Sequence, residues 1–493
     1  MGGLSRRGVL TAGAAAFAAA TAPTASAASA ASTTGAQTTR PTRERPFQAT
    51  PPAERPSRPN ILFILADDLG WADLSCYGAP EIRTPQLDAL AGQGVRFTHG
   101  YAASAVCSPT RLALYTGRYP GRLKAGLLEP IPGPGAGAGL PVVHPTLASL
   151  LKQAGYATAM FGKWHCGYLP DYGPVKSGWD TFFGNLGGAV DYFSKISGSG
   201  ETDLYEGEVR TESLEYYTRT VSERAAAFIR AGSGGPWLLN LNYTAPHWPW
   251  EGPADRAVSD DLTRRITEGQ EEGQILAHND GGSLSTYRMM VEAMDAGIGQ
   301  VLQALADSGQ QDDTLVIFSS DNGGERWSYL WPLTGSKGQL NEGGIRVPAI
   351  VRWPAGIGGN QVSDVPVVTH DWTATILEAA GVEPHAEYPL DGHSLIPYLL
   401  DGAQAPARDL FWRMRRSGAL RRGKWKYLRV LPQQEGQATQ QLLYDVTADP
   451  RERANRAAHE EELVARLSAA WDAIDAELED YPPQGGDRPG RSG

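Results

Sequence analysis

The sequence predicts an α/β fold, with a sheet that is covered by helices on both faces. Short continuous runs of apolar residues recur along the chain, and this is the pattern of a strand buried on both faces of a sheet. Helical patterns separate these runs, and strands that alternate with helices are typical of an α/β sheet. A chain of 493 residues, 41% of them hydrophobic, is long enough to bury the core of such a fold.

The individual elements follow from the local pattern. Runs of apolar residues predict five strands, at residues 61–65, 158–162, 237–243, 314–320 and 347–353. Apolar residues at helical spacing predict five helices, within residues 84–94, 144–156, 211–232, 285–309 and 370–381. Each helical segment carries a glycine at or beside its end, which is a helix stop signal.

Residues 1–30 have the features of an export signal. Paired arginines at Arg6 and Arg7 precede an alanine-rich apolar stretch, and small residues at 25–27 provide a cleavage site. This order resembles a twin-arginine signal, so we expect the mature protein to be periplasmic, cell-wall-associated or extracellular. No other apolar run approaches the ~20 residues that a membrane span needs, so we expect no membrane anchor.

Three further segments complete the predicted organisation. Residues 31–58 are rich in Thr, Ala, Pro and Arg, and we expect a flexible leader there. Residues 59–404 hold the alternating strands and helices and form the main domain. Residues 405–493 contain short strand candidates followed by a helix within 459–478, which predicts a small α+β domain of antiparallel strands with a disordered tail.

Composition excludes several classes of protein. The net charge of −11 argues against a nucleic-acid binder or a basic membrane-surface protein, because phosphate contacts need a cationic face. Three cysteines are too few for a disulfide scaffold. We expect Cys76 and Cys166 to be small buried apolar side chains.

Acidic residues fall where two of the predicted strands end. Asp67 and Asp68 follow the first strand, and Asp321 and Asn322 follow the fourth. Open α/β sheets bind ligands at the carboxyl ends of their strands. Three carboxylates and one amide oxygen suit a hard divalent cation such as calcium or magnesium. Either pair alone would equally fit an ordinary turn.

Basic residues fall at comparable places. Lys163 and His165 follow the second predicted strand, His247 follows the third, and Lys337 lies in a glycine-rich loop. Taken alone, a histidine is more often structural and a lysine more often a solvated surface charge. Together with a divalent cation, however, Lys163, Lys337 and Arg111 would outweigh the three carboxylates and create a local anion site. Sulfate and phosphate esters are the natural ligands of such a site.

Cys107 lies in the stretch VCSPTRLALYTGR, at what the pattern predicts to be the start of a helix. A helix N-terminus lowers the pKa of a thiol and makes it reactive. An exposed reactive thiol is quickly oxidised outside the cytoplasm, however. Cys107 is therefore either buried and inert, or it does not remain a cysteine.

The stretch from Cys107 to Arg118 resembles the sulfatase signature: cysteine, any residue, proline, any residue and arginine, followed by threonine-glycine. The resemblance continues in order through ADDLGWADLSCYG, GKWHCG, APHWPW, SSDNGG, GSKGQLNEGGIRVP and LYDVTADPRE, from about residue 60 to 451. The chain looks most like the arylsulfatase and N-acetylgalactosamine-6-sulfatase branch. This resemblance implies an alkaline-phosphatase-like fold, which is α/β with a large mixed, mostly parallel sheet.

The resemblance also implies a chemistry. In sulfatases the signature cysteine is oxidised to formylglycine, so a formylglycine-generating enzyme would act on Cys107 before export. The hydrated aldehyde would attack an aryl or carbohydrate sulfate monoester, form a sulfo-enzyme intermediate and then release inorganic sulfate. The implied substrate is a sulfated small molecule or glycan.

Site residues are implied by position. The residues that resemble the ligands of one Ca²⁺, with Mg²⁺ as the alternative, are Asp67, Asp68, Cys107, Asp321 and Asn322. The residues that resemble the catalytic groups are Cys107, Arg111, Lys163, His165, His247 and Lys337. Arg111 and Lys163 would hold the modified residue, and His165 would assist the release of sulfate. His247 and Lys337 would bind sulfate oxygens and protonate the leaving oxygen.

Two positions depart from the family pattern. A serine that the family carries near this point has no clear match in GWDTFFGNLGGAV, where Gly188 falls nearby. Cys166 stands where an aliphatic residue is usual. The segments 184–208 and 251–283 should line the substrate pocket, but they carry no readable substrate code.

Three alternatives remain open. A phosphate or phosphonate ester hydrolase of the same superfamily would use much of the same site. An exported binder of sulfated glycans would be expected if a nucleophile or metal ligand were missing, and none is missing here. A cysteine hydrolase would be inactivated by thiol alkylation.

Overall fold

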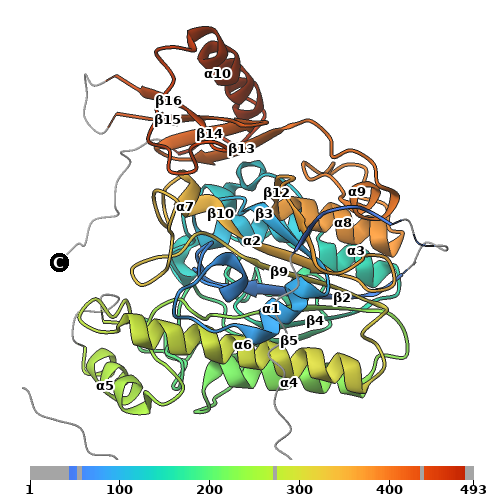
Figure 1. Ribbon diagram of the computed structural model, residues 1–493. Helices are drawn as coiled ribbons and strands as arrows, with labels where there is room; N and C mark the ends of the chain where they lie inside the picture. The colour runs from blue at the N-terminus through green and yellow to red at the C-terminus, as the bar shows by residue number, and fades with distance from the viewer. Residues whose placement is uncertain (1–43, 51, 53–57, 270–274, 433–437, 483–493) are drawn as a thin grey trace, which may run out of the picture. The chain divides into compact units, whose positions relative to one another are not determined.

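The computed structural model describes residues 44–50, 52, 58–269, 275–432 and 438–482. The expected export signal and the expected disordered tail lie outside these residues. Within them, a 12-stranded mixed sheet carries helices on both faces, and a separate four-stranded antiparallel sheet follows toward the C-terminus (Figure 1). No helix in the described ranges is long and apolar enough to cross a membrane.

Four parallel strands form the centre of the large sheet. In spatial order they are β9 (Thr314–Ser320), β2 (Asn60–Ala66), β8 (Trp237–Asn242) and β4 (Ala157–Gly162). Beyond β9, β10 (Arg346–Arg352) runs antiparallel to both of its neighbours, β9 and β3 (Val95–Tyr101). The strands nearer the two edges are β1 (Arg45–Pro46), β11 (Gln361–Ser363), β12 (Val367–Val368), β5 (Thr181–Gly184), β6 (Tyr205–Glu206) and β7 (Val209–Arg210).

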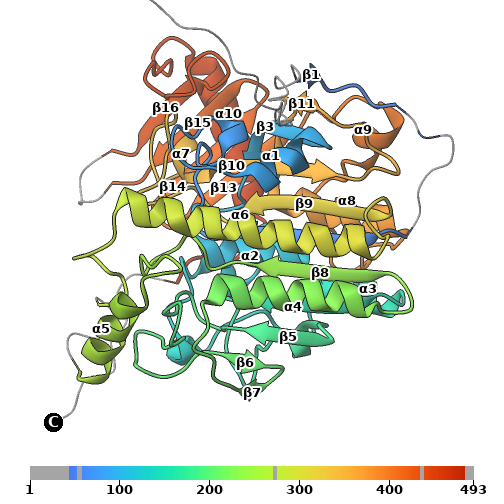
Figure 2. The same ribbon diagram turned by 60° about the horizontal axis from the view of Figure 1, so that its bottom comes forward.

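Alternate residues of the central strands face opposite helical layers, as the period of two in a strand requires. Leu62 and Ile64 of β2 pack against one layer, and Ile61 and Phe63 pack against the other. The first layer contains α1 (Pro85–Gly92), α4 (Tyr217–Ala231) and α6 (Leu284–Asp307), and Figure 2 shows α4 and α6 side by side. The second contains α2 (Cys107–Thr116), α3 (Leu147–Gln153), α8 (Thr369–Ala380) and α9 (Ile396–Asp401).

The strands and helices predicted from the sequence are all present, and the alternating α/β arrangement is confirmed. The sequence did not predict β3, because its stretch VRFTHGY mixes apolar residues with Arg96, Thr98 and His99. The segment expected to be a flexible leader contains β1, which pairs in parallel with β11. The helix α5 (Arg256–Thr267) was also not predicted.

The C-terminal sheet packs on both of its faces. Its strands are β13 (Asp409–Met414), β14 (Ser417–Arg422), β15 (Trp425–Val430) and β16 (Gln440–Asp445), and the helix after them is α10 (Glu461–Asp475). One face, with Phe411 and Leu420, packs against α10. The other face, with Trp412 and Leu428, packs in the same apolar cluster as Ala105, which precedes α2. The small α+β part therefore contacts the chain that leads into Cys107.

Candidate active site

Two acidic pairs meet at the carboxyl edge of the sheet because β2 and β9 are parallel neighbours. Asp67 and Asp68 follow β2, while Asp321 and Asn322 follow β9, and all four side chains are buried. The Asp68 backbone N–H donates to Asp321 Oδ1 at 3.2 Å. The Asn322 side-chain amide donates to Asp68 Oδ1 at 2.7 Å. These hydrogen bonds hold together two pairs of residues that lie about 250 residues apart in the sequence.

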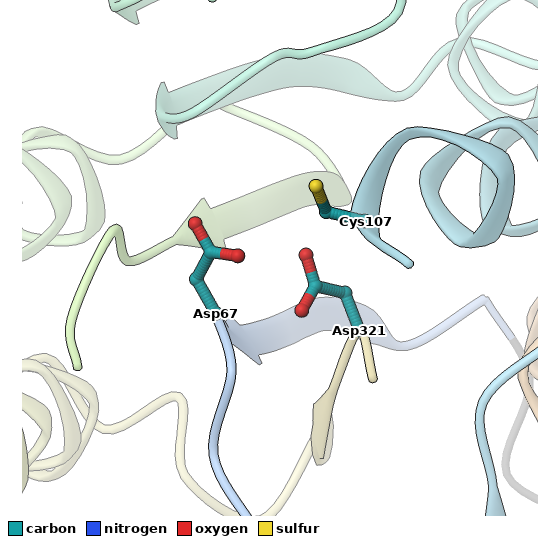
Figure 3. Close-up of side chains that lie close together, drawn as sticks. All are labelled: Asp67, Cys107 and Asp321. Carbon is teal, nitrogen blue, oxygen red and sulfur yellow. The ribbon is translucent and has the colours of Figure 1, made fainter. Parts of the chain in front are cut away.

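Cys107 opens α2 and points at this acidic group. Val106 takes an extended conformation as the N-cap, and α2 begins at Cys107 itself. One ligand atom of Cys107, Asp67 and Asp321 each lies within 4.8 Å of the others, and Figure 3 shows the three side chains converging. The expected helix start at Cys107 is therefore confirmed.

Arg111 lies one helical turn after Cys107, so it faces the same side of α2. Its Nε and Nη2 both donate to Asp321 Oδ2, at 3.0 and 2.8 Å, and its Nη1 donates to the backbone oxygen of Lys163 at 3.0 Å. The Arg111 side chain is fully buried. Burial disfavours the charged form, but Asp321 and Asp67 raise the pKa of Arg111 above its ordinary value, so it remains a cation.

Two lysines from distant segments contact the aspartates that follow β2. Lys163, directly after β4, donates from Nζ to Asp67 Oδ2 at 2.5 Å. Lys337 donates from Nζ to Asp68 Oδ2 at 2.7 Å. Burial tends to raise the pKa of Asp68, but Lys337 and His247 lower it well below its ordinary value, so Asp68 is ionised.

The two candidate histidines are buried and line the same cleft. His247 Nδ1 lies 2.7 Å from the Trp248 backbone oxygen, to which it donates, so the Nε2 atom faces the site at 3.6 Å from Asp68 Oδ2. His165 Nε2 donates to the Ile131 backbone oxygen at 3.0 Å. Burial lowers the pKa of both histidines well below 6.5, with Lys337 adding to the effect at His247 and Lys163 at His165.

Two buried oxygen atoms in this site are suited to a cation. Among the described residues, none donates a hydrogen bond to Asp67 Oδ1 or to Asn322 Oδ1. Burial and the nearby Asp321 carboxylate raise the pKa of Asp67 well above its ordinary value, despite the opposing charges of Lys163 and Arg111. A divalent cation would satisfy these oxygens and stabilise the ionised carboxylate. The all-oxygen aspartate and asparagine set fits Ca²⁺ or Mg²⁺.

As a thiol, Cys107 would be a weak nucleophile here. Its side chain is 2% exposed, and burial raises the pKa of the thiol even though Lys163 and Lys337 oppose the shift. The low thiol pKa that a helix N-terminus favours is therefore overcome by burial. This counts against the cysteine-hydrolase alternative.

A cleft of about 580 Å³ leads to Cys107, His165, His247 and Lys337. Residues 187–189, 197–199 and 201–203 line it, as expected for the segment 184–208. The segment 251–283 lines the cleft less than expected: of its described residues, only Leu276 does so.

The structure accounts for both departures from the family pattern. A Cβ atom on Gly188 would lie 2.7 Å from His165 Cε1, so any side chain there would press on that histidine. Cys166 is fully buried in the same apolar cluster as Trp164 and Trp179. It therefore fills core space, as expected. Cys76 is only partly buried, so the expectation that it is a buried side chain is met only in part.

Sequence reasoning missed residues that hold the site from behind. The Tyr192 hydroxyl donates to the His247 backbone oxygen at 2.9 Å, and the Asn242 amide donates to the Lys163 backbone oxygen at 3.0 Å. Asn242 had a detectable signal, because it and Asn240 are polar residues in a strand whose other residues are apolar. Tyr192 had none, since its partner lies 55 residues away.

Comparisons with known proteins agree on one family. The family model described as sulfatase matches residues 59–382. Arylsulfatase J of Mus musculus is 33% identical over 370 residues, which are 72% of this chain and 58% of that protein. Steryl-sulfatase of Mus musculus is 32% identical over 438 residues, which are 72% of this chain and 66% of that protein. The chain thus spans less than two thirds of each of these relatives.

The solved structures extend this likeness to the fold. Ps i-CgsB has a TM-score of 0.75 at 28% identity, over 86% of this chain and 94% of that one. The same protein was solved in complex with k-i-k-neocarrahexaose. The large mixed, mostly parallel sheet is that of the alkaline-phosphatase-like fold, as the resemblance implied. The family match includes every residue of the converging site, and the chain therefore belongs to the sulfatase family.

Proposed function

We propose that this protein hydrolyses sulfate monoesters of aryl or carbohydrate alcohols to the alcohol and inorganic sulfate. The observation that carries the proposal is the convergence of Cys107, Asp67 and Asp321 within 4.8 Å, surrounded by buried cationic side chains. Such a site can hold a tetrahedral anion and stabilise the charge that develops when its ester bond breaks. Membership of the sulfatase family supports sulfate as that anion.

Formylglycine at position 107 is part of the proposal, and it replaces a thiol that burial makes unreactive. The hydrated aldehyde has two hydroxyls, so sulfate taken up as a covalent ester on the first is released through the second. Arg111 and Lys163 hold residue 107 in place, and their positive charges balance those of the nearby aspartates. His165 lies where it can take a proton while sulfate is released. Asp67, Asp68, Asp321, Asn322 and the modified residue would hold one Ca²⁺ or Mg²⁺, which supplies a Lewis acid for the sulfate oxygens.

His247 and Lys337 act on the side of the leaving group. Both line the cleft beside Cys107, and both face Asp68. A protonated Lys337 binds a sulfate oxygen, the negative charge of the bound sulfate favours a proton on His247 Nε2, and the pair then delivers a proton to the leaving oxygen. This help matters most for a basic sugar alkoxide and least for a phenolate that leaves unaided.

The substrate class and location complete the proposal. The cleft is open enough to admit a sugar or an aryl group, and the oligosaccharide complex of Ps i-CgsB supports a sulfated glycan. The twin-arginine-like sequence at residues 1–30 supports export after modification by a formylglycine-generating enzyme. The acidic charge of the chain disfavours nucleic acid as a partner.

The proposal is tested first by mass spectrometry of the peptide that contains residue 107. Active enzyme should carry formylglycine there, and Cys107→Ser should complete at most one turnover. Intact, alkylatable cysteine in fully active protein would refute the modification. Because the aspartate and asparagine ligands are all oxygen donors, chelation should abolish turnover and Ca²⁺ or Mg²⁺ should restore it.

Matched sulfate and phosphate esters of one phenol then separate the two ester classes. A sulfatase should have a kcat/KM at least tenfold higher for the sulfate. The reverse preference would support the phosphate ester hydrolase instead, on the same fold and with much of the same site.

A further inference from the structure

Lys337 lies on a glycine-rich segment, residues 334–345, that contacts both acidic and nucleophilic parts of the site. The Lys337 backbone N–H donates to the Gly324 oxygen at 3.1 Å. The next N–H, of Gly338, donates to the Ala105 oxygen at 2.8 Å, two residues before Cys107. The position of this segment therefore decides where the Lys337 ammonium lies relative to Cys107.

The segment folds back closely on itself, and its buried apolar side chains, Leu340 and Ile345, lie in its C-terminal half rather than beside Lys337. A Cβ on Gly343 would lie 2.2 Å from the Gly335 oxygen, and a Cβ on Gly344 would lie 1.9 Å from the Gln339 oxygen. Glycines allow this close approach but give the backbone no anchors. Glu342, in the short helix α7 (Glu342–Ile345), is the acidic side chain that this segment buries completely.

Glu342 is anchored by the C-terminal sheet. Lys426 on β15 donates from Nζ to Glu342 Oε1 at 3.0 Å, and Glu452 Oε2 accepts from the Glu342 backbone N–H at 2.8 Å. Lys426 Nζ also lies 2.9 Å from Glu452 Oε1. All three charged side chains are buried. Burial alone would raise the pKa of Glu342, but Lys426 and other nearby cations lower it to about 2.

The stretch LYDVTADPRE brings two adjacent residues to opposite ends of the segment. Arg451 accepts through its backbone oxygen from Thr334 Oγ1 at 2.6 Å, and Glu452 reaches Glu342. Glu452 has a φ of 51°, a left-handed conformation that is uncommon for a residue with a side chain. Such strain persists only where the surroundings hold the residue in place. The contacts at both ends fit a clamp on the segment.

We propose that Lys426 and Glu452 are positioning residues that fix Lys337 in the active site through Glu342. This inference rests on the proposed role of Lys337 at the leaving oxygen. It gives the C-terminal sheet, which has no catalytic motif of its own, a direct part in the reaction. Removing Lys426 would take away the cation between the Glu342 and Glu452 carboxylates and leave Glu342 with Tyr101 and Arg346 as partners, so repulsion between the two carboxylates would shift the segment.

Simple docking of the C-terminal sheet is the competing explanation. Apolar contacts already dock it, because Trp412, Ala419 and Leu428 pack with Leu340 and Ile345 in one cluster. The hydrogen bond from Thr334 to the Arg451 oxygen and the buried ion pair of Lys426 with Glu342 add contacts close to the two ends of the segment. The two explanations differ in whether the loss of Lys426 acts through Lys337.

The first comparison is Lys426→Met against Lys424→Met. Lys424 lies two residues away in the same hairpin, but its side chain is 56% exposed and pairs with Asp445. Lys426→Met should lower kcat/KM for an alkyl sulfate ten- to a hundredfold, with a smaller loss for an activated aryl sulfate. Lys424→Met should stay within twofold of the wild type on both substrates.

A double-mutant cycle with Lys337→Ala then identifies the route of the effect. If Lys426 acts through Lys337, Lys426→Met should cost less than about threefold once Lys337 is already alanine. Losses that multiply in the double variant would overturn the inference. If Lys337→Ala alone has no effect, the proposed role of Lys337 fails instead, so the two failures are distinguishable.

A milder variant guards against misfolding of Lys426→Met. Thr334→Val removes the exposed contact to the Arg451 oxygen and leaves all buried charges in place. It should fold with an unchanged far-UV spectrum and lower kcat/KM for the alkyl sulfate about threefold, again only when Lys337 is present. An unchanged rate in Thr334→Val, together with additive losses in the cycle, would mean that the sheet only docks.

Discussion

Two site residues have backbone conformations that are unusual for residues with side chains. Asp68 has a φ of 63° and His165 a φ of 51°, both in the left-handed region. Aspartate and histidine tolerate this region better than most residues, but it still costs of order 1–3 kcal/mol. Each lies just past a strand end, where the backbone must leave the sheet. The left-handed conformation lets the Asp68 carboxylate reach Asn322 and Lys337, and it places His165 at the cleft.

Gly188 provides a test of how closely His165 is placed. A methyl group at residue 188 would lie 2.7 Å from His165 Cε1 and 3.0 Å from Nε2, so the imidazole must move. Gly188→Ala should therefore lower kcat at least tenfold, while the melting temperature changes little because residue 188 borders the cleft. Steady-state kinetics and thermal unfolding measure the two effects.

Gly133 is the matched control for this substitution. It lines the same cleft, but a Cβ on Gly133 has no heavy atom within 4 Å. Gly133→Ala should keep the wild-type kcat within twofold. Equal losses in both variants would show that the cleft is sensitive to any added side chain, and would contradict the special role of the contact with His165.

At the scale of elements, the site follows from the order of strands. Because β9, β2, β8 and β4 are parallel neighbours, their carboxyl ends lie at one edge and bring together residues that are distant in sequence. Loops after these strands then need support from other segments. The segment after β5 supplies part of it, since Tyr192 contacts the loop after β8.

Tyr192→Phe tests this support of one loop by another. The change leaves the buried His247 oxygen without its 2.9 Å hydrogen bond, so the free energy of unfolding should fall by about 1 kcal/mol. The released loop should also let His247 shift, and kcat/KM should fall about tenfold. Chemical denaturation and steady-state kinetics give both values.

Tyr216→Phe separates lost stability from lost positioning. Tyr216 stacks on Tyr192 and donates to the Glu251 backbone oxygen, also at 2.9 Å. Loss of the Tyr216 hydroxyl should lower the free energy of unfolding by a similar amount. It should leave kcat/KM within about twofold of the wild type, because this hydroxyl bonds to Glu251 and not to His247. Parallel losses of activity in the two variants would argue that the loop responds to stability alone.

Contacts of this kind, between segments far apart in the chain, could not be predicted from the sequence. Strand ends could be predicted because apolar runs and the acids after them are local patterns, and this placed Asp67 and Asp321 correctly at one edge. The antiparallel β10 and the unpredicted β3 could not be placed, since pairing partners leave no local signal. The hydrogen bond from Tyr192 to His247 likewise depends on the finished fold.

At the scale of the whole molecule, buried ion pairs connect the main sheet to the C-terminal part. Lys426 with Glu342 is one such connection, and Arg408 with Asp371 is another, since Arg408 lies on the chain that leads into β13. A net charge of −11 gave no indication of them, because composition does not say which charges are buried. Only the fold brings these partners together, and burial makes each pair sensitive to loss of either member.

His370, beside Asp371 at the same junction, should make the stability of the molecule depend on pH. It is 2% exposed, and burial together with Arg408 lowers its pKa from 6.5 to about 4, against the opposing charge of Asp371. Between these values the unfolded chain binds a proton that the folded protein does not. The free energy of unfolding should therefore fall by about 3 kcal/mol from this group as the pH drops from 6.5 to 4.

His370→Gln removes this titration while keeping a polar side chain beside Tyr119, whose ring lies 5.2 Å from that of His370. Urea denaturation of both proteins between pH 7.5 and pH 4 measures the effect. The stability of the wild type relative to the variant should be greatest at pH 7.5 and should decrease by about 3 kcal/mol on acidification. The opposite trend would require a raised histidine pKa in the folded protein. A difference that stays constant with pH would mean that His370 takes up a proton equally in both states, which burial in a junction of Arg408 and α8 should prevent.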